Sequence, residues 1–128
     1  RLYFFCQREE VVMDGIIGLG RLYDFYGELL TVHQRQIYEA AVYEDLSLNE
    51  IAKENGITKQ GVHDLIRRCT RTMEAYEEKL HMIERFQRLQ ALCEETSTLC
   101  QDASLSREEL AAGTEEKLQL MLQAISQD

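Results

Sequence analysis

The side chains best suited to chemistry lie close together, between positions 58 and 68, on what should be the outer face of one helix. Polar groups spaced one turn apart on such a face can reach the base edges and phosphates of a nucleic acid. Gln60 can form paired hydrogen bonds with adenine, Lys59 can contact guanine or phosphate, and an arginine most readily holds the backbone. The candidate binding residues are Thr58, Lys59, Gln60, Gly61, His63, Asp64, Arg67 and Arg68.

A second interpretation of the same face is an ordinary solvated surface. Asp64 stands three and four residues before Arg67 and Arg68, so these side chains could pair within the helix. Asp64 can accept a hydrogen bond from a cytosine amino group but repels phosphate, and Gly61 leaves a gap in the face. Both interpretations stay open on the sequence alone.

Charge is distributed unevenly along the 128-residue chain, which carries 14 Lys and Arg against 23 Asp and Glu, a net charge of -9. From Ser47 to Arg68 there are four cations and three anions, whereas from Leu89 onward there are two cations and eight anions. Acidity is thus concentrated away from the candidate residues. Because nonspecific affinity rises with each phosphate neutralised, a single copy should bind DNA weakly.

The spacing of three residues predicts that a helix-turn-helix carries these side chains. With Leu48 as the first of twenty positions, Ala52 is fifth, Gly56 ninth and Val62 fifteenth. The fifth position lies where the two helices cross and needs a small side chain, and the ninth needs a left-handed backbone, which glycine adopts easily. The fifteenth packs in the angle between the helices, where a branched apolar side chain fits. Meeting all three demands favours this motif over an ordinary helical hairpin.

The wider sequence predicts an all-α fold. Proline is absent, and apolar residues recur every three or four positions almost throughout. Helices are expected over 19–30, 32–43 and 48–54, with another from position 59, and side-chain caps should start several of them. The expected caps are Thr31 with Gln34, Ser47 with Glu50, Thr58, and Ser106 with Glu109. This pattern indicates a short-helix bundle followed by a long helix and a C-terminal helix.

Three segments are expected along the chain: a leader over 1–12, a helix-turn-helix bundle over 13–69, and a long helix with an acidic helical tail over 70–128. From Arg68 to position 101 there is no helix breaker, which predicts one continuous helix. That helix could pack on its own bundle or pair two copies of the chain, and the sequence favours neither.

The first residues, RLYFFCQREEVVMDG, suggest a segment that is not native. Arg8, Glu9 and Glu10 can be encoded by a purine run that looks like a bacterial ribosome-binding site shortly before Met13. We therefore expect the natural protein to begin at Met13 and the leader to be non-native or disordered. The alternative is an ordinary amphipathic leader whose apolar side chains dock on the body.

Composition argues against several other classes of protein. The four cysteines contain no C-x-x-C pair, so neither a zinc site nor a disulfide framework is expected. His33, His63 and His81 lie far apart without a catalytic partner, so we expect no enzyme and no cofactor. No apolar run is long enough to span a bilayer, and charged residues interrupt any signal peptide, which predicts a cytoplasmic protein without a membrane partner.

Five pieces of sequence between Leu22 and Phe86 carry a resemblance: DFY, LLT..QR, DLSLNEIA, KQGVHDLIRR and YEEKL. Together they resemble the YlxM family of small bacterial proteins, which is similar to region 4 of sigma-70 factors. The resemblance implies a helix-turn-helix of that kind and a DNA-binding or regulatory role. It also implies a link to the signal recognition particle pathway, because the family is usually encoded beside the signal recognition particle GTPase or its receptor.

Carried over by position, the base-reading residues of a sigma-like recognition helix fall on Lys59, Gln60, Gly61, His63, Asp64 and Arg67. Gly61 and Asp64 depart from the basic pattern of true sigma factors.

Two functions follow from this reading. One is a transcription regulator that binds DNA with the helix from Lys59 to about Cys69 in the major groove. It would be a homodimer through the long helix, so that two weak readers add up. The other is an adaptor that uses the same scaffold and the acidic tail to bind or regulate the signal recognition particle GTPase, with little or no DNA binding.

Overall fold

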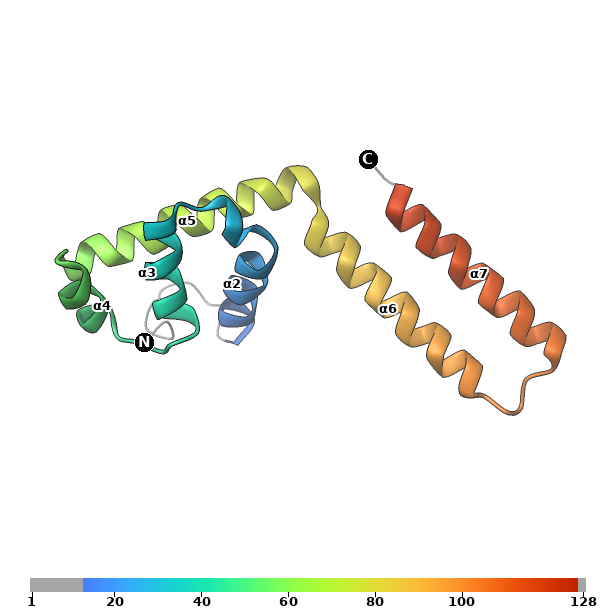
Figure 1. Ribbon diagram of the computed structural model, residues 1–128. Helices are drawn as coiled ribbons and strands as arrows, with labels where there is room; N and C mark the ends of the chain where they lie inside the picture. The colour runs from blue at the N-terminus through green and yellow to red at the C-terminus, as the bar shows by residue number, and fades with distance from the viewer. Residues whose placement is uncertain (1–12, 127–128) are drawn as a thin grey trace. The chain divides into compact units, whose positions relative to one another are not determined.

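The all-α fold is confirmed by the computed structural model, which describes residues 13–126 (Figure 1). Within that range the chain forms six α-helices and one 3-10 turn, and no strand. The described residues fall into two compact units that divide between Leu80 and His81. None of the described helices is both long and apolar enough to cross a membrane. The expected leader over 1–12 lies outside the described residues.

The first unit is built around its last helix. It contains α2 (Met13–Tyr26), the short η1 (Gly27–Leu29), α3 (Val32–Val42), α4 (Leu48–Asn55) and α5 (Lys59–Leu80). Helix α5 contacts α2, α3 and α4, which lie below it in Figure 1. The most deeply buried side chains are Ile37, Tyr38, Ile51, Val62, Ile66, Cys69 and Met73. Because the last four come from α5 and recur every three or four residues, α5 presents one apolar stripe to the other three helices.

The expected caps of α3 and α4 are confirmed. Thr31 Oγ1 accepts from the backbone amide of Gln34 at 3.2 Å, and Gln34 Oε1 accepts from the backbone amide of Thr31 at 2.9 Å. Ser47 and Glu50 repeat this arrangement with distances of 3.2 Å and 2.7 Å. Each pair satisfies two backbone amides that have no partner within the helix, and so fixes where the helix begins.

The turn between α4 and α5 has the geometry that the helix-turn-helix spacing predicts. Gly56 adopts the left-handed conformation, with φ of 64° and ψ of 29°, and the backbone amide of Ile57 donates to Ala52 O at 3.1 Å. Ala52 is 7% exposed and Val62 is fully buried, so the small and the branched residue both lie at the crossing of the two helices. The three position-specific demands of the motif are therefore met together.

The prediction of one continuous helix after Arg68 is wrong, because the helix is interrupted at His81. Helix α5 ends at Leu80, and α6 (Met82–Gln101) begins two residues later. Between them His81 takes the left-handed conformation, with φ of 52° and ψ of 31°, and its Nδ1 lies 3.0 Å from Glu84 Oε2. Histidine is one of the few residues other than glycine that are enriched in this conformation, so the break requires neither glycine nor proline.

The two units divide later in the chain than the expected boundary between 69 and 70. That position falls inside α5, whose Cys69 and Met73 are 1% and 0% exposed and belong to the core of the first unit. The recognition helix and the first part of the expected long helix are therefore one element.

Tyr38 places a phenol inside the apolar core of the first unit. Its ring stacks on Tyr23, with centroids 5.4 Å apart, and its hydroxyl lies 3.2 Å from Thr70 Oγ1. Since the Thr70 hydroxyl donates to Ile66 O at 2.9 Å, the Tyr38 hydroxyl is the donor of this pair. Burial raises the pKa of Tyr38 to about 12, although the hydrogen bond to Thr70 lowers it. The core thus holds the neutral phenol with its hydrogen bond satisfied.

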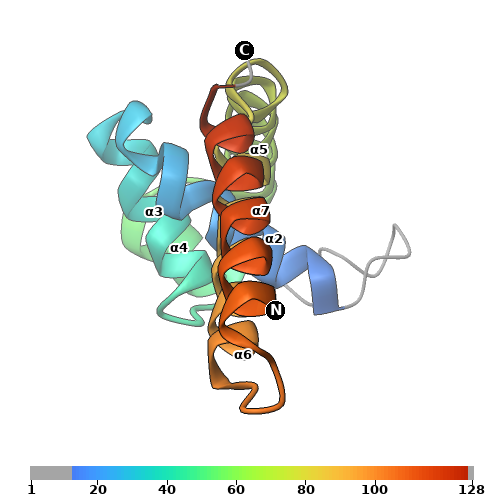
Figure 2. The ribbon, with the colours of Figure 1, turned by 90° about the vertical axis from the view of Figure 1, so that its right-hand side faces the viewer.

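The second unit is a hairpin in which α6 and α7 (Arg107–Ser126) run side by side in opposite directions (Figure 1), and α7 lies in front of α6 in the view of Figure 2. Lys117 Nζ donates to Glu95 Oε2 at 2.8 Å. A Cβ atom on Gly113 would come within 2.8 Å of Leu99 Cδ2, so the two helices approach closely there. These two contacts fix the register of the hairpin.

The connection between α6 and α7 confirms the expected cap at Ser106. Ser106 and Glu109 form the capping pair of α7, with distances of 3.1 Å and 2.8 Å. Asp102 Oδ1 accepts from the backbone amide of Ser104 at 2.9 Å and from its hydroxyl, and these bonds lower the pKa of Asp102. The acidic tail is therefore folded as a helical hairpin.

Substituting Gly56 should destabilise the first unit through the backbone alone. No heavy atom lies within 4 Å of a Cβ built on Gly56, so Gly56→Ala causes no clash. The substitution destabilises only because alanine is less stable than glycine in the left-handed conformation. We expect the free energy of unfolding to fall by about 1 to 2 kcal/mol in urea denaturation followed by circular dichroism. Gly20→Ala is the matched control: it also has no atom within 4 Å but lies inside α2, so it should stabilise by about 0.5 to 1 kcal/mol. Equal effects of the two substitutions would contradict this account of the turn.

Raising the pH should destabilise the first unit through Tyr38. The folded pKa of about 12 exceeds the ordinary value of 10.0, so the unfolded chain loses this proton first. The stabilisation is complete below pH 10.0 and is lost as the pH rises towards 12. Between pH 10 and pH 12 the free energy of unfolding of the wild type should fall by about 2 to 3 kcal/mol through Tyr38, and Tyr38→Phe should remove this part of the decrease. Urea unfolding at several pH values, compared between the two proteins, measures the difference; parallel curves would refute it.

Candidate nucleic-acid interface

The first turn of α5 presents the first group of candidate residues to solvent. Thr58, Lys59 and Gln60 are all exposed. The Thr58 hydroxyl accepts from the backbone amide of Gly61 at 2.9 Å, which confirms Thr58 as the cap of this helix. Its oxygen is therefore engaged in holding the helix start, whereas the side chain of Lys59 extends from the same turn.

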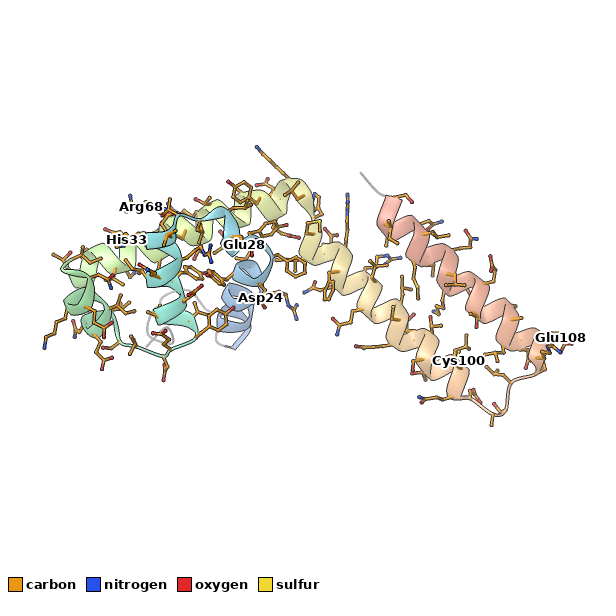
Figure 3. The ribbon with its side chains drawn as sticks, in the orientation of Figure 1. Asp24, Glu28, His33, Arg68, Cys100 and Glu108 are labelled. Carbon is orange, nitrogen blue, oxygen red and sulfur yellow. The ribbon has the colours of Figure 1, made fainter. Side chains whose placement is uncertain are left out.

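A shallow depression of about 480 Å³ follows along the same helix. It is lined by Gly61, Asp64, Arg67, Arg68 and Arg71. These positions recur at intervals of three, four and seven residues, so they share one face of α5, opposite the buried stripe. Figure 3 labels Arg68, whose side chain projects outward from α5. The structure thus brings four of the candidate residues together and adds a fifth member, Arg71; we call this surface the arginine depression.

Asp64 interacts with residues other than the arginines. Its Oδ1 accepts from Gln60 Nε2 at 3.1 Å and lies 3.5 Å from His63 Nδ1. This differs from the solvated interpretation, in which Asp64 pairs with Arg67 or Arg68. Among the residues that the structure describes, no ion pair involves the guanidinium groups that line the depression. They are therefore available to an anion.

His63 occupies a different environment from the other candidates. Its side chain is 34% exposed, compared with 54% for Asp64, because it stands beside the buried Val62 at the edge of the α5 stripe. The sequence placed His63 on the outer face with the rest, whereas the structure turns it towards the border of that face.

Arg71 is the residue that sequence reasoning missed. The candidate binding residues end at Arg68, yet Arg71 stands three residues after it and seven after Asp64. This helical spacing places Arg71 on the same face as Asp64 and Arg68, provided that the helix continues that far. The structure shows that α5 continues to Leu80.

Cys69 lies next to these arginines but faces the core. Burial raises the pKa of its thiol, although the charge of Arg68 lowers it. The thiol is thus a packing group. Within residues 13–126, no three His, Cys, Asp or Glu side chains gather in a way that could hold a metal ion.

The fold and the geometry of this face define a helix-turn-helix protein. Helix α4 packs against α5, and Gly56 forms the turn between them. Helix α5 presents its N-terminal turn and the arginine depression to solvent.

The chain belongs to the family described as "Putative helix-turn-helix protein, YlxM / p13 like" (UPF0122), which it matches over residues 13–113. It is similar to a UPF0122 protein of Symbiobacterium thermophilum, with 39% identity over 102 residues that cover 78% of this chain and 95% of that protein. A UPF0122 protein of Bacillus cereus is 39% identical over 99 residues, covering 77% of this chain and 90% of the relative. One from a Thermoanaerobacter species is 42% identical over 76 residues, 59% of this chain and 65% of the relative. The resemblance to the YlxM family is thereby confirmed.

Proposed function

We propose that this chain is a cytoplasmic DNA-binding regulatory protein in which α5 enters the major groove in the manner of a sigma-70 region 4 recognition helix. The observation that carries the proposal is the arginine depression. Three exposed guanidinium groups line it without an ion pair to any residue that the structure describes, about two turns beyond the exposed helix start. Guanidinium groups bind phosphate oxygens through paired hydrogen bonds, which suits them to a nucleic-acid backbone.

The candidate residues divide into two roles along α5. Arg67, Arg68 and Arg71 contact phosphates, because they lie beyond the helix start, where a recognition helix leaves the groove. Lys59 and Gln60 reach base edges from the first turn. Gly61, which has no side chain, allows the nucleic acid to approach the helix closely. Asp64 remains as an unfavourable charge within the site.

Local charge supports this proposal despite the acidity of the whole chain. Between Thr58 and Thr72 there are four cations and one anion, whereas residues 81–128 contain four cations and nine anions. The segment from Thr58 to Thr72 thus carries a net charge of +3, against -5 for residues 81–128. Because each neutralised phosphate contributes separately to affinity, three arginines give modest binding by a single copy.

Salt-titrated binding to a fluorescent DNA duplex tests the phosphate role. Wild-type affinity should fall steeply with salt, and Arg67→Ala, Arg68→Ala or Arg71→Ala should each weaken binding. Each substitution should also reduce the magnitude of the slope of log K against log salt by about 0.9, the contribution of one phosphate contact. Fluorescence anisotropy between low and physiological salt measures both quantities.

Two further substitutions control for general charge effects. Lys79→Ala removes the same charge from the exposed end of α5, outside the depression, and should leave the slope unchanged. Asp64→Asn removes the anion within the depression and should strengthen binding. A wild-type protein without salt-dependent binding, or equal losses for Arg68→Ala and Lys79→Ala, would exclude the DNA-binding proposal.

A second function is favoured by a separate surface on the hairpin, where a depression of about 790 Å³ is strongly acidic. Its lining residues are Ala91, Glu94, Glu95, Thr98, Leu99, Gln101, Asp102 and Lys117. The single cation, Lys117, is already paired with Glu95. Such a surface suits a basic protein segment. Together with the genomic setting of the family, it supports a role as an adaptor or regulator of the signal recognition particle GTPase.

Co-purification of the full chain with that GTPase tests the adaptor function. The complex should survive nuclease treatment, and Glu94→Lys should weaken it because the substitution places a cation in the acidic depression. Glu115→Lys makes the same charge change on α7 outside this depression and should have little effect. Loss of the complex on nuclease treatment, or equal weakening by both variants, would exclude direct binding through this surface.

A further inference from the structure

The hairpin carries an apolar face that neither of its own helices covers. Three large apolar side chains of α7 are 45%, 56% and 61% exposed: Leu118, Leu122 and Ile125. Across from them, α6 contributes the half-buried Leu89 and the exposed thiols of Cys93 and Cys100. We call these six residues the hairpin face; Figure 3 labels Cys100 near the end of the hairpin at which the two helices are connected.

Register shows that both halves of the hairpin face lie on the same side of the hairpin. Residues that contact the opposite helix are followed directly by members of the face: Leu92 by Cys93 and Leu99 by Cys100 on α6, and Lys117 by Leu118 and Ala124 by Ile125 on α7. A step of one residue turns the side chain by about 100° around a helix. Because the two helices are antiparallel, that turn leads to the same side of the hairpin in both.

The core between α6 and α7 is too small to account for the stability of this unit. Among residues 81–126, only Leu92 and Ala124 are buried, at 6% and 2% exposure. Two helices of twenty residues each expend considerable conformational entropy when they fold, and an isolated pair with such a core is marginal in water. Covering the hairpin face would supply the missing apolar burial.

The distribution of charge indicates what covers this face. The six residues of the hairpin face are uncharged, and the charged residues that flank them on the same side of α7, Arg107 and Glu115, carry one charge of each sign. Glu94, Glu95 and Asp102 line the acidic depression on another side of the hairpin. Nucleic acid or an anionic membrane would require cations on the face, and a charged partner would require complementary charges around it. A second hairpin requires neither. Two copies related by a two-fold axis would bury apolar against apolar surface while their acidic depressions point away from each other.

We propose that the hairpin face binds the same face of a second copy of this chain, giving a four-helix bundle at the centre of a homodimer. A helix of twenty residues is about 30 Å long, and two helices side by side are about 20 Å wide. Each copy can therefore bury about 600 Å², and the pair about 1,200 Å², the lower limit for a specific interface. This dimer replaces pairing through one long helix, since α5 and α6 are separate helices.

The test uses the full chain and two adjacent residues of α7. Leu122→Glu places a carboxylate in the hairpin face, whereas Gln123→Glu places one at the next, exposed position outside it. Sedimentation equilibrium should give a dimer for wild type and for Gln123→Glu. The dissociation constant of Leu122→Glu should be about 100-fold higher or more, because the two-fold axis buries two unpaired carboxylates.

Thermal unfolding gives a second, independent measurement. The melting temperature of the wild type should rise with protein concentration, whereas that of Leu122→Glu should not, because only association couples stability to concentration. Helicity from circular dichroism checks that Leu122→Glu remains folded; its 56% exposure means that the substitution removes little from the core of a single copy.

Three outcomes would overturn the proposal. The first is a wild-type monomer at all concentrations, which would assign the hairpin face to another part of this chain or to another protein. The second is a dimer weakened equally by Leu122→Glu and Gln123→Glu. The third is a dimer that neither substitution weakens, which would place the interface elsewhere. None of these measurements involves DNA, so the proposed DNA binding can fail or succeed independently.

Discussion

The packing of α5 against three other helices is the constraint on which the first unit depends. Val62, Ile66, Cys69 and Met73 commit one stripe of this helix to the core that it shares with α2, α3 and α4. Once that stripe is buried, helical geometry leaves no choice about which residues face solvent. The arginine depression lies opposite the core stripe, so the core fixes the direction in which its side chains leave α5.

The parts of this architecture that could be predicted from sequence are those set by local chemistry. A hydroxyl followed three residues later by Gln or Glu marks a helix start wherever it stands, and Thr31, Ser47 and Ser106 each do so. The turn at Gly56 could also be predicted, because few residues other than glycine tolerate the left-handed backbone conformation. The break at His81 could not be read in this way, because histidine is compatible with both helix and left-handed backbone and its choice depends on surroundings outside the local sequence.

The candidate site was predictable in position but less so in detail. Helical periodicity places Gly61, Asp64, Arg67 and Arg68 on one face without any structure, whereas the partner of Asp64 could not be predicted by counting residues. An aspartate has potential partners at several helical spacings, and small differences in side-chain conformation decide between Gln60 and the arginines. Arg71 could not be predicted as a site residue either. It belongs to the site because α5 continues past it to Leu80, and the sequence did not show where this helix ends.

The hydrogen bond between Gln60 and Asp64 has a consequence for any sequence preference this helix could display. The amide that would read adenine is already donating to an acceptor four residues away. The Gln60 amide keeps its second N–H and its oxygen, so the bond to Asp64 leaves it able to bind and favours one orientation of its side chain. The orientation of this amide is thus set within the protein before any ligand arrives.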